Sequence, residues 1–141
     1  MALKILVLST TNSTLGPMAQ GFLDYYSSKK TQVISAGLAP EPTHQMAVKV
    51  MDSLGIPVER SRMNFNEIED ISFDYIITFS KKANEIAVSK AKKAQIFHLD
   101  MNSLDETSGT DKEIKKAFKS SRQELQDYCM DFAEKYLQKK K

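Results

Sequence analysis

A run of small and hydroxyl-bearing residues follows directly on a short apolar run near the start of the chain. The apolar run covers Ile5 to Leu8 and is typical of a strand buried on both faces. The residues that follow it are Ser9, Thr10, Thr11, Asn12, Ser13, Thr14, Leu15 and Gly16. Pro17 comes next and suits the first turn of a helix, because its missing N–H has no partner there. The sequence therefore predicts a strand, a turn and a helix in succession, the junction where α/β proteins hold anions.

Strand-like and helix-like patterns then alternate along the whole chain. Further strands are expected at 32–36, 73–79 and 94–99, and residues 100–110 are expected to form a loop. Helices are expected from Pro17, from an N-cap at Thr43 to a stop at Gly55, around 83–87, and from Asp111 nearly to the end. This order predicts one α/β domain over residues 1–141, a three-layer fold with a four-stranded parallel sheet and helices on both faces.

Composition restricts the classes of partner. The formal net charge of the 141 residues is +2, which is too small to indicate a nucleic-acid partner, and Lys139 to Lys141 are expected to form a solvated basic tail. No apolar window approaches the length of a membrane span, and the first residues lack a signal-peptide layout. We therefore expect a cytoplasmic protein with no membrane or nucleic-acid partner, and we expect neither a cofactor nor a metal.

The stretch from Ile5 to Ala19 resembles the signature of the low-molecular-weight protein tyrosine phosphatases and of the thioredoxin-coupled arsenate reductases that share their fold. Asn12, Ser13, Pro17, Met18 and Ala19 match that signature. Further matches follow in order at Ser35 to Gly37, Ala47 to Ile56, Asp74 to Phe79, and Gly109 with Ile114, Phe118 and Arg122. The resemblance implies the low-molecular-weight phosphatase fold for nearly the whole chain, with a phosphate-binding loop at residues 9–16.

The departures from this family concern its catalytic positions. The resemblance places the nucleophilic cysteine on Ser9, the phosphate-binding arginine on Leu15, and the general-acid aspartate near Ser103 and Leu104. The second redox cysteine of the reductases falls on or near Ser80. A serine hydroxyl is a far weaker acid than a thiol and needs a neighbouring base. Leucine offers nothing to an oxyanion, whereas arginine binds one through two parallel hydrogen bonds.

Several residues of the loop region admit two interpretations. The hydroxyls of Thr10, Thr11, Ser13 and Thr14 either donate to an anion or satisfy backbone groups in the turn, and both interpretations stay open. Asn12 is expected to take the left-handed conformation that a tight cradle requires. Leu15 is expected to close the loop by apolar contact. Asp100 and Asp105 flank the position of the missing acid, and we favour a solvated role for both over replacement of that acid.

The remaining chemistry-bearing residues are few. Cys129 is the only cysteine and shares helical register with Leu125 and Phe132, which predicts a buried structural thiol. His44 and His98 are the only histidines, and we favour a packing or capping role for His98. Met63, Phe65 and Ile68 form either an exposed face that anchors a protein partner or a lid packed on its own domain.

These observations give three ranked hypotheses and one separate alternative. The leading hypothesis is a catalytically inactive phosphatase-like protein that binds a small oxyanion, such as phosphate or sulfate, or a protein partner. The second is a weak phosphomonoester hydrolase of the phosphotyrosine type that uses Ser9 as nucleophile and Asp100 or Asp105 as proton donor. Arsenate reduction comes last, because it needs two or three cysteines in succession. The alternative is a pure protein-interaction module.

Overall fold

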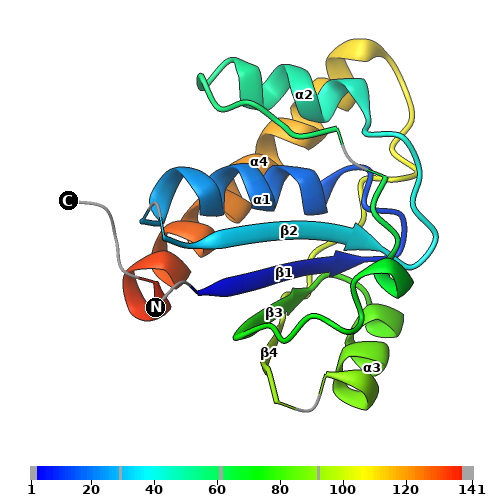
Figure 1. Cartoon of the computed structure of the whole chain (residues 1–141). Coiled ribbons are helices and arrows are strands. Elements are labelled where there is room, and N and C mark those ends of the chain that lie inside the picture. Colours follow the sequence, from blue (N-terminus) through cyan, green and yellow to red (C-terminus); the bar gives the residue numbers. More distant parts are fainter. Residues whose placement is uncertain (1–2, 29, 61, 92, 138–141) are drawn as a thin grey trace.

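The computed structural model describes residues 3–28, 30–60, 62–91 and 93–137. Its elements in chain order are β1 (Lys4–Ser9), α1 (Leu15–Tyr26), β2 (Gln32–Gly37), α2 (Gln45–Asp52), the 3-10 helix η1 (Phe65–Glu67), β3 (Tyr75–Thr78), α3 (Lys81–Lys90), β4 (Gln95–His98) and α4 (Asp111–Tyr136) (Figure 1). The expected alternation of strands and helices is confirmed. The basic tail at Lys139 to Lys141 lies outside the described residues.

The sheet has four parallel strands in the order β2-β1-β3-β4. Strand β1 pairs with β2 and with β3, so that Leu8 lies opposite Ala36 on one side and Thr78 on the other. Ile5 to Leu8 are fully buried, as expected for a central strand covered on both faces. Because all four strands run the same way, their carboxyl ends meet at one edge of the sheet, which is where the loop after β1 lies (Figure 1).

Two apolar clusters cover the two faces of the sheet. Helices α1, α2 and α4 pack together on one face around Phe22, Met51 and Phe118. Helix α3 and the segment 63–73 cover the other face. Phe65 and Ile68 are buried in this second cluster, so the expectation of an exposed apolar face there is wrong and the lid interpretation is correct. The three-layer fold predicted from the sequence is confirmed.

Side-chain hydrogen bonds cap the first turns of helices α2, α3 and α4, and the capping residue of α2 differs from the predicted one. Thr110 and Glu113 form a capping box at the start of α4, and the Ser80 hydroxyl accepts from the N–H of Ala83 at the start of α3. Helix α2 is capped by His44 and not by Thr43, because the imidazole Nδ1 accepts the N–H of Met46 at 3.0 Å. No helix in the described ranges is long and apolar enough to cross a lipid bilayer.

Asp24 on α1 carries an unfavourable charge. Withdrawal of water by the surrounding protein, and then the negative charge of Glu59, raise the pKa of Asp24 from 3.8 to about 6. The folded state therefore binds more protons than the unfolded state between these two values. The free energy of unfolding consequently falls as the pH rises through this window and stays lower above it.

We expect Asp24→Asn to stabilise the protein at neutral pH, because the neutral amide avoids both the loss of hydration and the repulsion from Glu59. Thermal melts from pH 3.5 to 8 should show the melting temperatures of variant and wild type converging at the acid end, separating between pH 3.8 and about 6, and keeping a constant difference above that window. Asp127→Asn, on the exposed surface of α4, is the control and should show no such separation. A wild type that is more stable than Asp24→Asn at neutral pH would contradict the prediction.

Candidate functional site

The turn between β1 and α1 forms a cradle, which we define as residues 9–16. Ser9 is the last residue of β1 and Leu15 the first of α1, so residues 10–14 make the whole connection. Thr14 precedes the helix without a side-chain cap bond. The first N–H groups of a helix have no partner within the helix, and its dipole makes this end positive. Helix α1 therefore directs a positive potential at the cradle.

The carbonyl groups of the cradle face the segment 38–44. Four of them accept backbone N–H groups from this segment, in the pairs Ser9–Leu38 (3.1 Å), Thr10–Ala39 (2.8 Å), Thr11–Glu41 (2.9 Å) and Ser13–His44 (2.8 Å). In a trans peptide the C=O and the following N–H point in opposite directions. The N–H groups that follow these carbonyls therefore point away from the segment 38–44, and one of them, that of Asn12, donates to the Ser9 hydroxyl within the cradle.

Asn12 holds the turn from within. Its φ is +53°, which confirms the expected left-handed conformation. Its backbone N–H donates to the Ser9 hydroxyl at 3.0 Å, and its side-chain Nδ2 donates to the buried Ser35 hydroxyl at 3.1 Å. Ser35 in turn donates to Gln20 of α1 at 2.7 Å. A buried polar chain thus connects the cradle to β2 and α1.

Asp105 places a carboxylate against the hydroxyl groups of the cradle. Thr11 donates to it at 2.8 Å, Thr14 at 2.9 Å and Ser13 at 3.3 Å. Asp105 is exposed, as expected, but the sequence did not predict that its carboxylate also accepts these three hydroxyl groups. The carboxylate is held here because the three hydroxyl groups donate charge-assisted hydrogen bonds to it. Such bonds are stronger than those between neutral groups. These hydroxyls bind an anionic group that the chain itself supplies.

A cavity of about 140 Å³ opens over the cradle. Its lining consists of Ser9, Thr10, Thr11, Ser13, Thr14, Leu15, Phe79, Ser80, Ser103 and Asp105. Among the described residues, the lining contains no cysteine, no arginine and no lysine, and its one ionisable side chain is the carboxylate of Asp105. The start of helix α1 is therefore the feature of the described lining that favours an anion.

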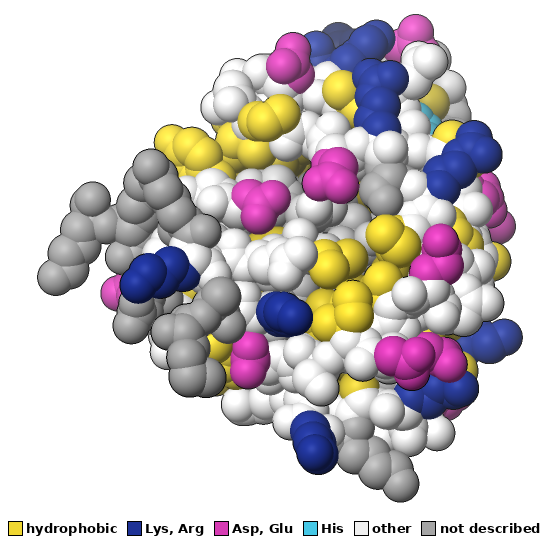
Figure 2. All heavy atoms as spheres, viewed as in Figure 1, with side chains coloured by type: hydrophobic (Ala, Val, Ile, Leu, Met, Phe, Trp, Pro, Cys, Tyr) yellow, Lys and Arg dark blue, Asp and Glu magenta, His cyan; other side chains and the backbone are white. Residues whose placement is uncertain are grey.

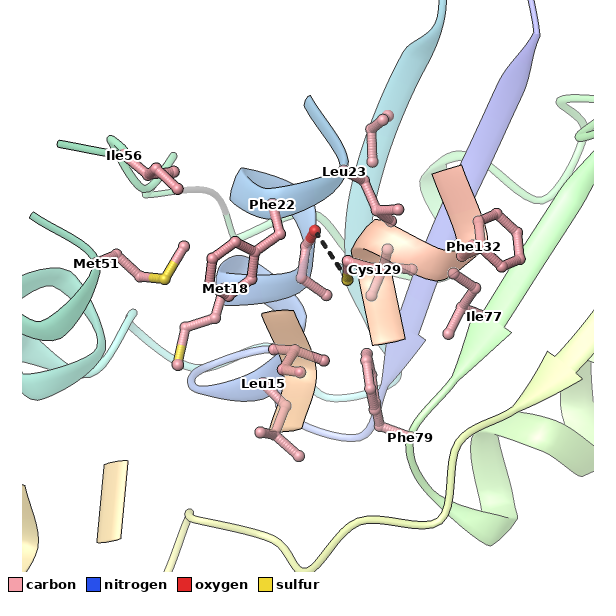
Figure 3. Close-up of a cluster of buried hydrophobic side chains, with 14 of the residues drawn as sticks. Leu15, Met18, Phe22, Leu23, Met51, Ile56, Ile77, Phe79, Cys129 and Phe132 are labelled. Atoms are coloured by element: carbon pink, nitrogen blue, oxygen red, sulfur yellow. Dashed lines mark hydrogen bonds between the residues drawn. The ribbon is translucent and has the colours of Figure 1, made fainter. Parts of the chain in front are cut away.

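Leu15 forms the apolar wall of the cavity. It is 5% exposed and belongs to the core cluster on the α1 face of the sheet. Figure 3 shows Leu15 and Phe79 at the same end of this cluster, near Met18. Leu15 makes the expected apolar contact, but it lines the cavity and does not fill it.

Some of the other candidate residues line the cavity, and others lie outside it. Ser80 and Ser103 line the cavity, and Ser80 also accepts from the hydroxyl of Thr10 at 3.0 Å. Asp100 is exposed and does not line the cavity. His98 lies outside it and contacts the Thr78 hydroxyl at 2.9 Å through Nδ1, a polar link between β4 and β3.

Cys129 is remote from this chemistry. It is fully buried between α4 and α1, with its Sγ 4.0 Å from the carbonyl oxygen of Ala19 (Figure 3). Burial raises the pKa of its thiol, so the reactive thiolate is suppressed. The expectation of a structural thiol is confirmed. Among the described residues, no group of three or more His, Cys, Asp or Glu side chains is arranged to hold a metal ion.

Comparisons with known proteins agree with the observed fold. The sequence model described as "Low molecular weight phosphotyrosine protein phosphatase" matches residues 4–141. A protein of Shouchella clausii (strain KSM-K16) named "Arsenate reductase" is 27% identical over 136 residues, which cover 95% of this chain and 98% of that protein.

Two solved structures share the fold at low sequence identity. Vibrio vulnificus Wzb in complex with benzylphosphonate has a TM-score of 0.77 at 21% identity, with 96% of this chain and 99% of that one covered. A cysteine-to-serine mutant of YwlE arginine phosphatase, with a phosphorylated active-site serine, has a TM-score of 0.72 at 20% identity, with 94% of each chain covered. Identities this low show the fold alone.

The contact between Asn12 and Gly16 gives a test of the cradle geometry. A Cβ on Gly16 would lie 2.0 Å from Oδ1 of the buried Asn12 side chain. We expect Gly16→Ala to destabilise the fold by about 1–3 kcal/mol, as overpacking does in other interiors. Urea unfolding measures this loss.

The matched control is the double variant Asn12→Gly with Gly16→Ala. Glycine adopts the left-handed conformation without a side chain to collide with, so the added methyl group fits. The effect of Gly16→Ala should therefore be much smaller in the Asn12→Gly background than in the wild type. Equal effects in the two backgrounds would contradict the geometry.

Proposed function

Because the chain belongs to the low molecular weight phosphotyrosine protein phosphatase family, we propose that it is a phosphatase-fold protein without efficient turnover, whose cradle binds a phosphate-like oxyanion. The observation that carries the proposal is the pairing of four cradle carbonyls with the segment 38–44. This pairing directs the adjacent N–H groups away from the segment 38–44, and we assign those of Thr10, Thr11 and Thr14 as oxyanion donors beside a cavity whose described lining holds neither a thiol nor a guanidinium group. Main-chain donors are sufficient to bind an oxyanion, but they supply no nucleophile.

Loss of turnover follows from the side chains of the cavity. Ser9 stands where the family resemblance puts the nucleophile, and no described residue that lines the cavity is a histidine or lysine able to take its proton. Leu15 gives no charge to stabilise a phosphoryl group in the transition state, a role for which arginine is used in comparable enzymes. We therefore assign binding and not catalysis to this site.

Asp105 controls access in this proposal. Its carboxylate already accepts from Thr11, Ser13 and Thr14, so an incoming oxyanion competes for the same hydroxyls. Two negative groups a few ångströms apart also repel, by several kcal/mol at about 4 Å in the partly solvated surroundings of a protein surface. Binding of phosphate thus requires that Asp105 move away or be neutral.

Phosphate titration tests the binding proposal. Cradle amide resonances from Thr10 to Thr14 should shift on addition of sodium phosphate in ¹H–¹⁵N NMR spectra, and calorimetry gives the affinity. Asp105→Asn should bind phosphate about tenfold or more tightly than the wild type, because the repulsion is removed. Asp100→Asn makes the same charge change outside the cavity and should leave the affinity unchanged. Cradle amides that stay unmoved in both the wild type and Asp105→Asn would overturn the proposal.

A second candidate function is slow phosphomonoester hydrolysis through Ser9. It is favoured by one observation, the position of Asp105 at the mouth of the cradle that holds Ser9. In this scheme Ser9 Oγ attacks phosphorus and passes its proton to a phosphate oxygen, the ester bond breaks, and the leaving oxygen takes a proton from Asp105. Water then attacks the phosphoserine and gives a proton back to the Asp105 carboxylate, while Ser9 Oγ leaves with the proton held by the phosphate and inorganic phosphate is released. The phosphorylated active-site serine of the YwlE mutant supports the first of these steps as chemically feasible in this fold.

We expect no hydrolysis of para-nitrophenyl phosphate above the uncatalysed rate, and no mass increase at Ser9 after incubation with this substrate. Intact-mass spectrometry and absorbance measure the two quantities, with Ser9→Ala as the control for both. Turnover that disappears in Ser9→Ala would establish the second candidate in place of the first. Phosphorylation of Ser9 without turnover would leave the cradle as a phosphoryl acceptor.

Arsenate reduction is not proposed, although two curated relatives carry that name. Reduction of arsenate through thiols needs a succession of cysteines that pass on a disulfide. This chain has one cysteine, and it is buried away from the cradle.

A further inference from the structure

A second hollow lies between the start of α2 and the start of α4. This groove has a volume of about 490 Å³. It is lined by His44, Gln45, Met46, Lys49, Asp111, Lys112, Ile114 and Lys115. None of these residues lines the cavity over the cradle. The volume is within the range of protein sites that bind ligands of moderate size.

The groove carries an excess of positive charge. Lys49 extends from α2, and Lys112 and Lys115 from the first turns of α4, against the single carboxylate of Asp111. All three lysines are exposed, and none forms an ion pair with a described residue. Figure 2 shows Lys and Arg side chains, with a few acidic ones among them, over the part of the molecule where Figure 1 places α2 and the start of α4.

Lys112 lies at a position where a positive charge is unfavourable in the free protein. It lies in the first turn of α4, where the helix dipole is positive and disfavours a cation. The like charge of Lys115, three residues along the same helix, adds repulsion. An anionic occupant of the groove removes both costs.

The backbone of the groove argues against a compact phosphate as this occupant. The imidazole of His44 already accepts the N–H of Met46, and the hydroxyl of Thr110 already accepts the N–H of Glu113. Both helix starts thus have amides occupied by the chain's own caps. The charged donors of the groove are flexible lysine ammonium groups on opposite walls, which suit carboxylates spaced along a chain.

The lining also offers an apolar surface. Met46 and Ile114 are half-buried and face the groove from α2 and α4. Methionine adapts its shape to different partners and is common at peptide-binding surfaces. An occupant that combines carboxylates with one apolar side chain matches both features of the groove.

We propose that this groove binds an acidic peptide segment of a partner protein, with its carboxylates paired to Lys49, Lys112 and Lys115 and an apolar side chain against Met46 and Ile114. The proposal does not depend on anion binding in the cradle. The two sites are nevertheless joined through the backbone, because the N–H of His44 donates to the carbonyl of Ser13 at 2.8 Å.

Fluorescence anisotropy with a short fluorescein-labelled peptide of Glu and Asp residues around one central Leu tests the proposal on the full chain. The groove variant combines Lys49→Glu, Lys112→Glu and Lys115→Glu. The matched control makes the same charge change on exposed lysines elsewhere, with Lys82→Glu, Lys93→Glu and Lys119→Glu. Circular dichroism melts establish that both variants are folded, and a milder Lys→Gln set at the groove positions replaces the first variant if it is not.

The wild type should bind the peptide, and the groove variant should weaken that binding about tenfold more than the control does. A peptide with Ser in place of the central Leu should bind less tightly. Equal losses in the two variants would overturn the proposal, because the binding would then report net charge only. Inorganic tripolyphosphate that binds the groove more tightly than the peptide would overturn it as well, in favour of a compact polyanion.

Discussion

Hydrogen bonds between the turn after β1 and the segment after β2 determine the shape of the cradle. Four carbonyls of the turn are fixed by N–H groups of residues 38–44, and the trans peptide geometry then turns the neighbouring N–H groups away from that segment. Asn12 adds a left-handed residue and a buried bond to Ser35, which links the turn to the sheet. The cradle is thus built mainly by the backbone. Substitution of the Ser9 or Leu15 side chain changes its chemistry without removing these backbone bonds.

The same arrangement explains why the cradle holds a carboxylate. The start of helix α1 and three hydroxyls favour a negative group at this position, and no described residue of the cavity lining is cationic. Asp105 from the loop before α4 satisfies the three hydroxyls. The free protein therefore already holds a carboxylate at the cradle. The oxyanion that we propose would have to displace it, so its affinity would depend on how much more strongly it binds than this carboxylate.

Much of the fold and part of the site were predictable from the sequence. The apolar run at Ile5 to Leu8 and the periodicity of α4 determined the sheet and its long helix, because burial on two faces or along one stripe leaves a clear pattern. The conformation of Asn12 and the burial of Cys129 were predictable for the same local reasons. The contact of Asp105 with Thr11 spans the sequence from one loop to another, and an exposed aspartate carries no local signal of its partner. The cap at His44 was missed because threonine is the commoner capping residue, and the burial of Phe65 and Ile68 depends on their packing against the sheet.

The hydroxyl of Ser9 has a consequence for how the cradle tolerates peroxide. Accessible thiolates pass through sulfenic to sulfinic and sulfonic acids, and the later products are irreversible. A serine hydroxyl does not enter this series. The chain's single thiol, Cys129, is fully buried and held in its protonated form. Peroxide that oxidises an accessible thiolate therefore leaves the described side chains of the cradle unchanged.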